Sequence, residues 1–271
     1  MRRIDKNSSI FETDEYKKDK NKFYIIEMNL SSLGLMLYSD EASYVICRGE
    51  EGRPTWVWTA DDITDEKMSE ALSVITDKYL SLTESTKYTA KKEFYSYLKR
   101  VGYPYLGDEY FEMGALECKN AKRPVKCRGY SEKAKSLDID LLAEYWRADN
   151  LEMNISEPIT PERAKKDVEE MLDSGNLWVL RDENEKIVSM VWYKITGDQV
   201  KLSHVYTPPE KRGLGYASTL IYEVTEMLLG MGLTPLLYTD YNYPPSNKAY
   251  KNAGYDDMGI LINFNCKKRK Y

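Results

Sequence analysis

The residues best suited to chemistry lie at 205–218, where β-branched and aromatic side chains lead into a basic, glycine-rich turn. If a strand ends before this turn and a helix spans about 216–229, several backbone N–H groups stay unpaired between them. Gly213 and Gly215 let the backbone approach a ligand, Arg212 adds a charged donor, and the helix dipole favours an anion. The segment predicts a phosphate-binding site, with a plain glycine-rich turn as the simpler alternative.

The spacing within this segment excludes two common nucleotide loops. A Walker loop requires Gly-Lys-Ser/Thr after four intervening residues, but Gly215 is followed by Tyr-Ala-Ser. A dinucleotide fingerprint requires a third glycine near Ser218. The residues from Arg212 to Ala217 follow the pattern R-x-x-G-x-A instead.

This pattern resembles the coenzyme A pyrophosphate loop of the GNAT superfamily of N-acetyltransferases. Residues 243–255 resemble the second signature of that superfamily. In that signature a short helix carries a tyrosine, here Tyr250, four residues before a Gly-aromatic pair, here Gly254 and Tyr255. The two segments have the order and separation of the family, so the resemblance rests on both together.

The resemblance implies acetyl-coenzyme A as the cosubstrate. The family commonly has Asn seven residues before the tyrosine, where this chain has Tyr243, so the pantetheine contact is assigned to Ser246 or Asn247. The implied cofactor-binding residues are Val205, Tyr206, Thr207, Arg212, Gly213, Leu214, Gly215, Tyr216, Ala217, Ser218, Ser246 and Asn247.

Acetyl transfer to an amine needs a base for the ammonium proton, donors for the oxyanion and an acid for the thiolate. The resemblance implies Tyr250 as the acid and the backbone N–H groups of 205–207 as the donors. For the base, the sequence leaves His204 and Asp240 as candidates, with Glu210 comparable. An imidazole ordinarily titrates near neutral pH, which suits His204, and Asp240 ends the next predicted strand.

The elements that position these residues follow from hydrophobic periodicity and turn signals. They predict an α/β fold with a mixed sheet and helices on its faces, which is also the GNAT-like acyl-CoA N-acyltransferase fold that the resemblance implies. The expected order is a strand at 125–130, a helix around 137–146, a helix at 160–173, strands at 177–181, 186–195 and 199–207, a helix at 216–229, a strand at 236–240, a short helix and a closing strand.

The chain is expected to comprise a polar N-terminal segment (1–22), a first domain (23–122) and a catalytic domain (124–271). The first domain resembles a second copy of the fold, in which the strand 55–60 and the helix 63–82 flank the position of the cofactor loop.

That position holds residues 61–66, which contain four carboxylates and no glycine and would repel a pyrophosphate. Leu98 stands where the tyrosine would be. We interpret the chain as a duplicated fold with a degenerate first copy. An unrelated N-terminal cap is the alternative.

Composition limits the classes of function. A net charge of −5 argues against a nucleic-acid binder, and no apolar stretch has the length of a membrane span, so a cytoplasmic protein is expected. The four cysteines lack metal-ligand spacing, and a single histidine excludes a multi-histidine metal site.

The expected acceptor is a small-molecule amine or a peptide amine, which the sequence does not identify, and the oligomeric state stays open. A non-catalytic coenzyme A-binding or sensor protein remains the alternative to an enzyme, because both would use the same loop.

Overall fold

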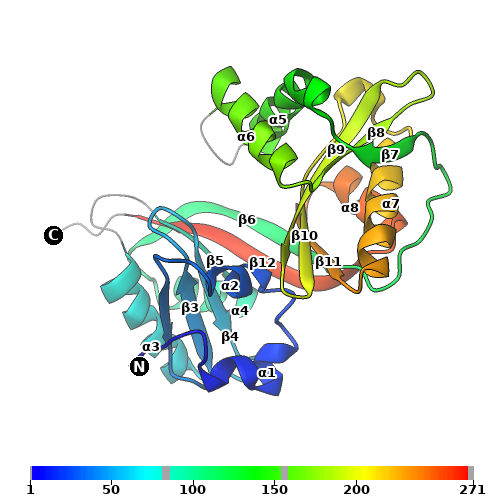
Figure 1. Cartoon of the computed structure of the whole chain (residues 1–271). Helices are drawn as coiled ribbons and strands as arrows, with labels where there is room; N and C mark the ends of the chain where they lie inside the picture. Colours follow the sequence, from blue (N-terminus) through cyan, green and yellow to red (C-terminus); the bar gives the residue numbers. More distant parts are fainter. Residues whose placement is uncertain (1, 81–85, 154–157, 268–271) are drawn as a thin grey trace. The chain divides into compact units, whose positions relative to one another are not determined.

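The computed structural model describes residues 2–80, 86–153 and 158–267 (Figure 1). The chain divides into two compact units. Unit 1 comprises Met1–Ala115, Thr239–Asn242 and Met258–Tyr271, and unit 2 comprises Leu116–Tyr238 and Tyr243–Asp257.

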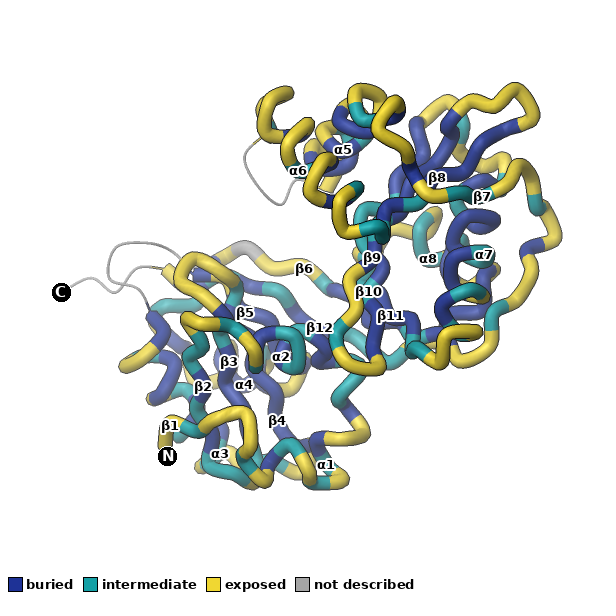
Figure 2. The backbone as a smooth tube through the Cα atoms, in the orientation of Figure 1, coloured by how far each residue is buried: buried dark blue, intermediate teal, exposed yellow. Residues whose placement is uncertain are grey.

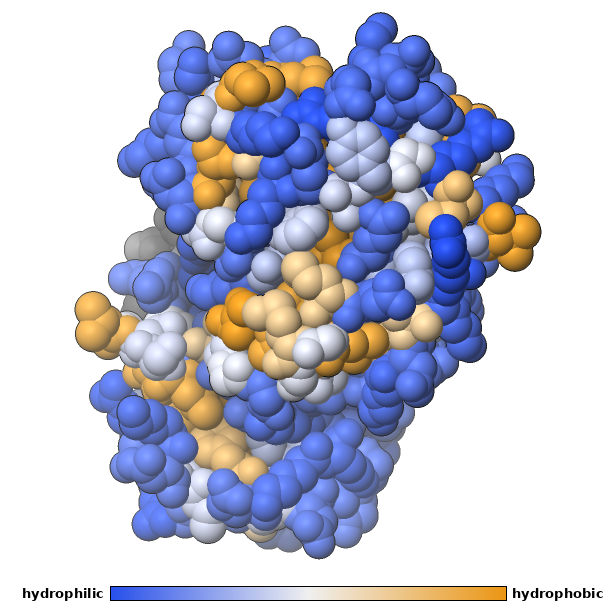
Figure 3. All heavy atoms as spheres, turned by 45° about the vertical axis from the view of Figure 1, so that its right-hand side comes forward, coloured by the Kyte–Doolittle hydropathy of each residue, from blue (hydrophilic) through white to orange (hydrophobic). Residues whose placement is uncertain are grey.

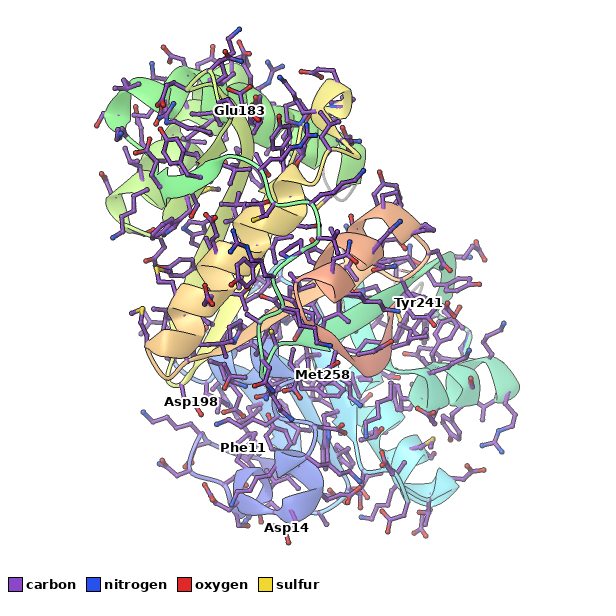
Figure 4. The ribbon with its side chains drawn as sticks, turned by 90° about the vertical axis from the view of Figure 1, so that its right-hand side faces the viewer. Phe11, Asp14, Glu183, Asp198, Tyr241 and Met258 are labelled. Atoms are coloured by element: carbon purple, nitrogen blue, oxygen red, sulfur yellow. The ribbon has the colours of Figure 1, made fainter. Side chains whose placement is uncertain are left out.

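Unit 2 contains a mixed sheet with the strand order β11-β10-β9-β8-β7. The strands β10 and β11 are parallel, and the other neighbouring pairs are antiparallel. Glu183 and Asp198, labelled in Figure 4, lie in the predicted hairpin turns on either side of β9. The elements in chain order are β7 (Tyr130–Lys133), α5 (Ile139–Met153), α6 (Pro161–Asp173), β8 (Leu177–Arg181), β9 (Ile187–Thr196), β10 (Gln199–Tyr206), α7 (Tyr216–Gly230), β11 (Thr234–Asp240) and α8 (Pro244–Asn252).

Local sequence signals account for the helix starts in this unit. Thr160 caps α6, because its side chain accepts a hydrogen bond from the N–H of Arg163, and proline occupies the first helical position. Gly215 precedes α7 with a φ of 96°, a left-handed conformation that glycine adopts without steric cost. Both helices were predicted within one residue of these bounds.

Strand alternation gives the sheet of unit 2 two apolar faces. Successive side chains of β8 point to opposite sides, so Val179 packs with α5 and α6 whereas Leu180 packs with α7 and α8. Figure 1 shows the two helix pairs on opposite faces of this sheet. Burial follows the same plan, and β8 is dark along most of its length in Figure 2.

The strands of unit 1 follow the order β1-β2-β3-β4-β5-β12-β6. Helices α3 and α4 pack on one face, where Tyr88, Phe94 and Phe264 belong to a single buried cluster. The elements are β1 (Arg2–Arg3), α1 (Asp14–Lys17), α2 (Tyr24–Asn29), β2 (Met36–Ser39), β3 (Tyr44–Arg48), β4 (Thr55–Thr59), α3 (Asp65–Val74) with a π-helical turn at Ile75–Tyr79, β5 (Thr86–Lys91), α4 (Lys92–Arg100), β6 (Leu106–Glu117) and β12 (Asp256–Cys266).

The N-terminal segment is part of unit 1 rather than a separate polar extension. Ile10 and Tyr16 are fully buried, and the ring of Tyr16 contacts that of Trp58 edge-on with centroids 5.2 Å apart. Figure 4 labels Phe11 and Asp14 in this segment. Its apolar residues are few, so composition alone does not reveal that they are buried.

Two sequence predictions differ from the structure. No strand forms at 125–130, and the first strand of unit 2 is β7 at Tyr130–Lys133. The closing strand β12, predicted within the catalytic domain 124–271, pairs antiparallel with β5, and Met258–Tyr271 belongs to unit 1. An alternating strand pattern states that one face is buried but not which sheet edge the strand joins.

The surface offers no broad apolar face on the side drawn in Figure 3, where hydrophilic side chains predominate and apolar ones form scattered groups. Among the described residues, no helix combines the length and apolar character needed to cross a membrane.

Candidate active site

The predicted phosphate loop lies between β10 and α7. Within the described residues, no protein acceptor takes the N–H groups of Gly215, Tyr216, Ala217 and Ser218. The first hydrogen bond of α7 is donated by Thr219 to the carbonyl of Gly215, at 3.0 Å. Four consecutive donors at a helix N-terminus form a concave site that suits an anion.

The two glycines of the loop have different surroundings. A Cβ on Gly215 would lie 2.7 Å from the carbonyl oxygen of Lys126, so this glycine is required by a close backbone approach. Gly213 has a φ of 75°, but nothing lies within 4 Å of the position its Cβ would take. Gly213 therefore faces open space, where a ligand can approach the backbone.

Arg212 is engaged by two protein groups. Its Nε donates to the carbonyl of Thr207 at 2.8 Å, and its Nη2 donates to both carboxylate oxygens of Glu152 at 2.8 and 2.7 Å. The contact with Thr207 ties the end of β10 to the loop. With these contacts the guanidinium of Arg212 stabilises the conformation of the loop, and the free hydrogen-bond donors are the backbone N–H groups.

Strand β10 carries a bulge just before the loop. Its ladder with β9 shifts register between Ser203 and Tyr206, and His204 has a φ of 56°. A left-handed residue that is not glycine is uncommon and is typical of bulges and functional sites. The parallel ladder with β11 covers only Gln199–Lys201, so the rest of β10 extends beyond it. Of the predicted residues in this extension, Val205 lies at the bulge and Tyr206 pairs with Met190 of β9.

His204 lies in a partly enclosed cluster with Asp149 of α5. Its Nδ1 is 3.4 Å from Oδ2 of Asp149, and the two side chains are 22% and 10% exposed. The imidazole contacts Trp146 edge-on at 4.1 Å and stacks on Trp192 at 5.9 Å between ring centroids. Sequence reasoning missed Asp149. The available signal was an acidic residue three positions after Trp146, on the buried stripe of an amphipathic helix.

Tyr250 lies on α8 in the apolar cluster between that helix and the sheet. Its hydroxyl forms no hydrogen bond within the described part of the chain, whereas that of Tyr255 bonds to Oγ1 of Thr225 at 2.8 Å. Burial, and to a lesser degree the charge of Asp149, raise the pKa of Tyr250 above its ordinary value. Ser246 and Asn247 are half-buried in the first turn of the same helix.

The other two candidate bases lie elsewhere. Asp240 is exposed at the end of β11, accepts a hydrogen bond from the N–H of Asn242 at 2.8 Å and belongs to unit 1. Glu210 is exposed before the loop, where it lines a cavity of about 400 Å³ together with Tyr145 and Ile187. His204 and Glu210 belong to the same compact unit as Tyr250, and Asp149, which lies beside His204, also acts on the pKa of Tyr250.

Among the described residues no group of three or more His, Cys, Asp or Glu side chains could hold a metal ion. All four cysteines are free, and three of them are buried.

The segment after β4 in unit 1, which the sequence analysis compared with the cofactor loop, takes part in an ion-pair network. Lys91 lies 2.5 Å from Oδ2 of Asp19 and 2.6 Å from Oδ1 of Asp61, and Trp58 donates its indole N–H to Asp19 at 3.0 Å. Lys18 also pairs with Asp61, at 2.8 Å. These groups lie beyond the parallel pairing of β4 and β5, which covers Thr55–Val57.

Comparison with known proteins agrees with the GNAT fold. Residues 140–255 match the acetyltransferase (GNAT) family. Among curated proteins, no sequence matches the chain.

Solved structures share the fold over nearly the whole chain. An acetyltransferase of the GNAT family from Colwellia psychrerythraea superposes with a TM-score of 0.58 at 11% identity, covering 98% of this chain and 99% of the other. A GCN5-related N-acetyltransferase from Kribbella flavida has a TM-score of 0.54 at 13% identity, covering 91% and 95%. At these identities the likeness concerns the fold, which therefore includes unit 1 as well as unit 2.

Proposed function

We propose that this protein is an N-acetyltransferase that transfers the acetyl group of acetyl-coenzyme A to a primary amine by direct attack. The observation that carries the proposal is the row of free N–H groups from Gly215 to Ser218. A pyrophosphate bound there would accept these hydrogen bonds and lie at the positive end of the α7 dipole. Gly213, which has open space around it, lets the anion approach.

The end of β10 provides the second part of the proposed site. The bulge at His204 interrupts the ladder with β9 and the ladder with β11 ends at Lys201, so the pairing of β10 is broken within the stretch from Val205 to Thr207. Backbone N–H groups in this stretch are the proposed donors to the oxyanion that develops on the thioester carbonyl. Arg212 holds the carbonyl of Thr207, which fixes the strand end relative to the loop.

The proposed chemistry forms the N–C bond of the amide and breaks the C–S bond of the thioester. His204 takes a proton from the ammonium form of the acceptor, which makes the amine nucleophilic. Tyr250 gives its hydroxyl proton to the departing thiolate and regains one from solvent. Its raised pKa keeps the phenol protonated at neutral pH, so it is available as a donor. The net products are the amide, free coenzyme A and one proton.

A non-catalytic coenzyme A-binding or sensor protein would use the same loop. The hydroxyl of Tyr250 favours an enzyme, because it is a polar group in an apolar cluster that has no structural hydrogen bond to make. A sensor has no use for such a group.

Two measurements test the proposal. Calorimetry of the full chain is expected to find one acetyl-coenzyme A per chain, because the segment after β4 in unit 1 is acidic and its Asp61 is already paired with Lys18 and Lys91. A panel of primary amines, including polyamines, aminoglycosides, amino acids and peptides, is then screened for release of free coenzyme A, with amine-free reactions as the control. Binding without turnover on any amine favours the sensor, and absence of binding contradicts both functions.

A further inference from the structure

We infer that Asp149 positions His204 as the proton acceptor for the amine, by holding the imidazole in the tautomer that carries its proton on Nδ1. The inference rests on the proposed function and adds a residue to it. Asp149 belongs to α5, far in sequence from both signature segments.

The pairing follows from two buried atoms. Oδ2 of Asp149 and Nδ1 of His204 are buried 3.4 Å apart, and neither atom has a hydrogen-bond partner within the described residues. A buried carboxylate is costly unless a donor faces it. If Nδ1 carried a lone pair, two acceptors would meet at 3.4 Å. A proton on Nδ1 removes this conflict, so the geometry selects that tautomer.

The choice of tautomer determines what the rest of the ring can do. In a neutral imidazole one nitrogen is a donor and the other an acceptor, so a proton on Nδ1 leaves the lone pair on Nε2. His204 keeps 22% of its side chain exposed although Nδ1 is buried, so the accessible surface lies on the remainder of the ring. When Nε2 takes a proton, the resulting imidazolium faces the carboxylate of Asp149, which stabilises it.

The ring is held in this orientation from two sides. Trp146 contacts it edge-on and Trp192 stacks on it. Both indoles are themselves fixed, because Trp146 donates to Asp167 at 3.1 Å and Trp192 donates to Ser174 at 3.1 Å. The left-handed backbone at His204 directs the side chain from the bulge toward α5, at a cost of about 1 to 2 kcal/mol.

The chain has one histidine, which makes the tautomer directly observable. Untagged protein labelled with ¹⁵N in histidine gives a two-bond ¹H–¹⁵N spectrum with a single imidazole, so no assignment is needed. We expect a protonated Nδ1 and an unprotonated Nε2 above neutral pH. Asp149→Leu, which has nearly the same shape without an acceptor, is expected to give a mixture of tautomers. The opposite tautomer in the unmodified protein, or an unchanged spectrum in the variant, overturns the pairing.

Kinetic measurements with an amine that the protein acetylates test whether Asp149 and His204 act together in the reaction. Asp149→Leu and His204→Gln are each expected to lower kcat by about 10²-fold or more while leaving coenzyme A affinity unchanged. The double variant should be no slower than His204→Gln, because the residues act as one unit. Asp140→Asn, an exposed change on the same helix, is the control and should retain full activity.

The outcomes separate this inference from the proposed function. Full turnover by Asp149→Leu overturns the positioning role while leaving the acetyltransferase in place. Failure of every amine in the unmodified protein overturns the enzyme, and with it the base, whatever the tautomer spectrum shows. If Asp149→Leu does not fold, Asp149→Ala, which also lacks an acceptor, replaces it in both measurements, and a turnover equal to that of the unmodified protein again counts against the pairing.

Discussion

Glu152, in the last turn of α5, holds Nη2 of Arg212 with both of its carboxylate oxygens, at 2.8 and 2.7 Å. The pair places a negative charge next to the loop proposed to bind a pyrophosphate. It also engages the one cationic side chain of the signature loop, Arg212. Glu152 therefore competes with the ligand for this guanidinium.

The first prediction is that Glu152→Gln binds coenzyme A more tightly than the unmodified protein. The change removes a repulsive charge and releases Arg212, and an exposed pair of this kind contributes about 0 to 1 kcal/mol, so a gain of up to about fivefold is expected. Titration calorimetry at two salt concentrations measures it, and the difference should shrink at high salt. Weaker binding by Glu152→Gln would mean that the pair is needed to shape the loop.

A second prediction concerns the charge at Gly213. Asn and Asp tolerate a positive φ better than other side chains, and the space around Gly213 is open. Gly213→Asn and Gly213→Asp are therefore a matched pair that differs mainly in charge. Like charges about 4 Å apart repel by about 1 to 4 kcal/mol, so Gly213→Asp should lose roughly tenfold or more in coenzyme A affinity relative to Gly213→Asn. Equal affinities would place the pyrophosphate elsewhere.

Gly215 is unsuitable for this test, because any side chain there would clash with the backbone of Lys126.

The third prediction is that the Lys91 network stabilises unit 1. Lys91 is buried, and Lys91→Met would leave Asp19 with fewer partners, at an expected cost of about 3 kcal/mol in the free energy of unfolding. Lys18→Met removes an exposed lysine from the same network and should change the stability little. Urea unfolding measures both variants, and equal midpoints for them would contradict the prediction.

The same network predicts a dependence on acid. The ammonium groups of Lys18 and Lys91 lower the pKa of Asp61 to about 2. A carboxylate whose pKa is lower in the folded than in the unfolded state stabilises the fold above its ordinary pKa near 4 and loses this effect as the pH falls toward 2. The urea midpoint of Asp61→Asn should therefore lie below that of the unmodified protein at pH 5 and approach it at pH 2.

The sequence predicted the loop and α7 because their causes are local. Gly213 and Gly215 both adopt the left-handed conformation that the glycine-rich pattern indicates, and α7 starts at the predicted residue. The element order of unit 2 was equally readable, since each strand and helix carries its own periodicity.

Asp149 could not be predicted as a site residue, and it lies beyond the helix predicted around 137–146. Its role depends on the approach of α5 to the bulge of β10, which brings Asp149 beside His204. A contact between segments so far apart in the sequence leaves no local signal. The same limit explains β12, whose pattern does not encode its pairing with β5. The burial of the N-terminal segment could not be predicted for the same reason. Asp19 in this segment contacts Lys91 and Trp58, which are distant in sequence.

The fourth prediction concerns Lys201, a half-buried lysine of β10 opposite Lys194 of β9. Burial, with a smaller contribution from the charge of Lys194, lowers the pKa of Lys201 to about 8. The ammonium is therefore disfavoured in the fold at neutral pH. Lys201→Met should raise the free energy of unfolding at pH 7 by about 1 to 2 kcal/mol, which is less than the pKa shift alone implies because solvent reaches the group and the contact with Tyr238 is lost.

The sign of this pH effect is opposite to that of Asp61. Between pH 8 and about 10.4 the unfolded chain binds more protons at Lys201 than the fold does, so stability should rise with pH across this window. Lys201→Met should lack that rise, and the exposed control Lys186→Met should retain it. Urea midpoints at pH 7 and 9.5 measure the difference, and identical pH responses in all three proteins would contradict it.

The fifth prediction is that Tyr250→Phe slows the chemical step without weakening the fold. The Tyr250 hydroxyl has no hydrogen bond to lose within the described residues, so the thermal unfolding midpoint should stay unchanged. Loss of a general acid should lower the single-turnover rate by about 10²- to 10⁴-fold, while coenzyme A affinity stays nearly constant.

Tyr255→Phe is the matched control on the neighbouring aromatic position. Its hydroxyl bonds to Thr225 in the core, so its removal should cost about 1 kcal/mol of stability and leave the chemical step intact. Tyr250→Phe is thus expected to lose rate but not stability, and Tyr255→Phe to lose stability but not rate. Burial raises the pKa of Tyr250, so the unmodified enzyme should show no loss of turnover from ionisation of this phenol below pH 10. Single-turnover rates separate chemistry from slow product release, and an unchanged rate in Tyr250→Phe would remove the tyrosine from the mechanism.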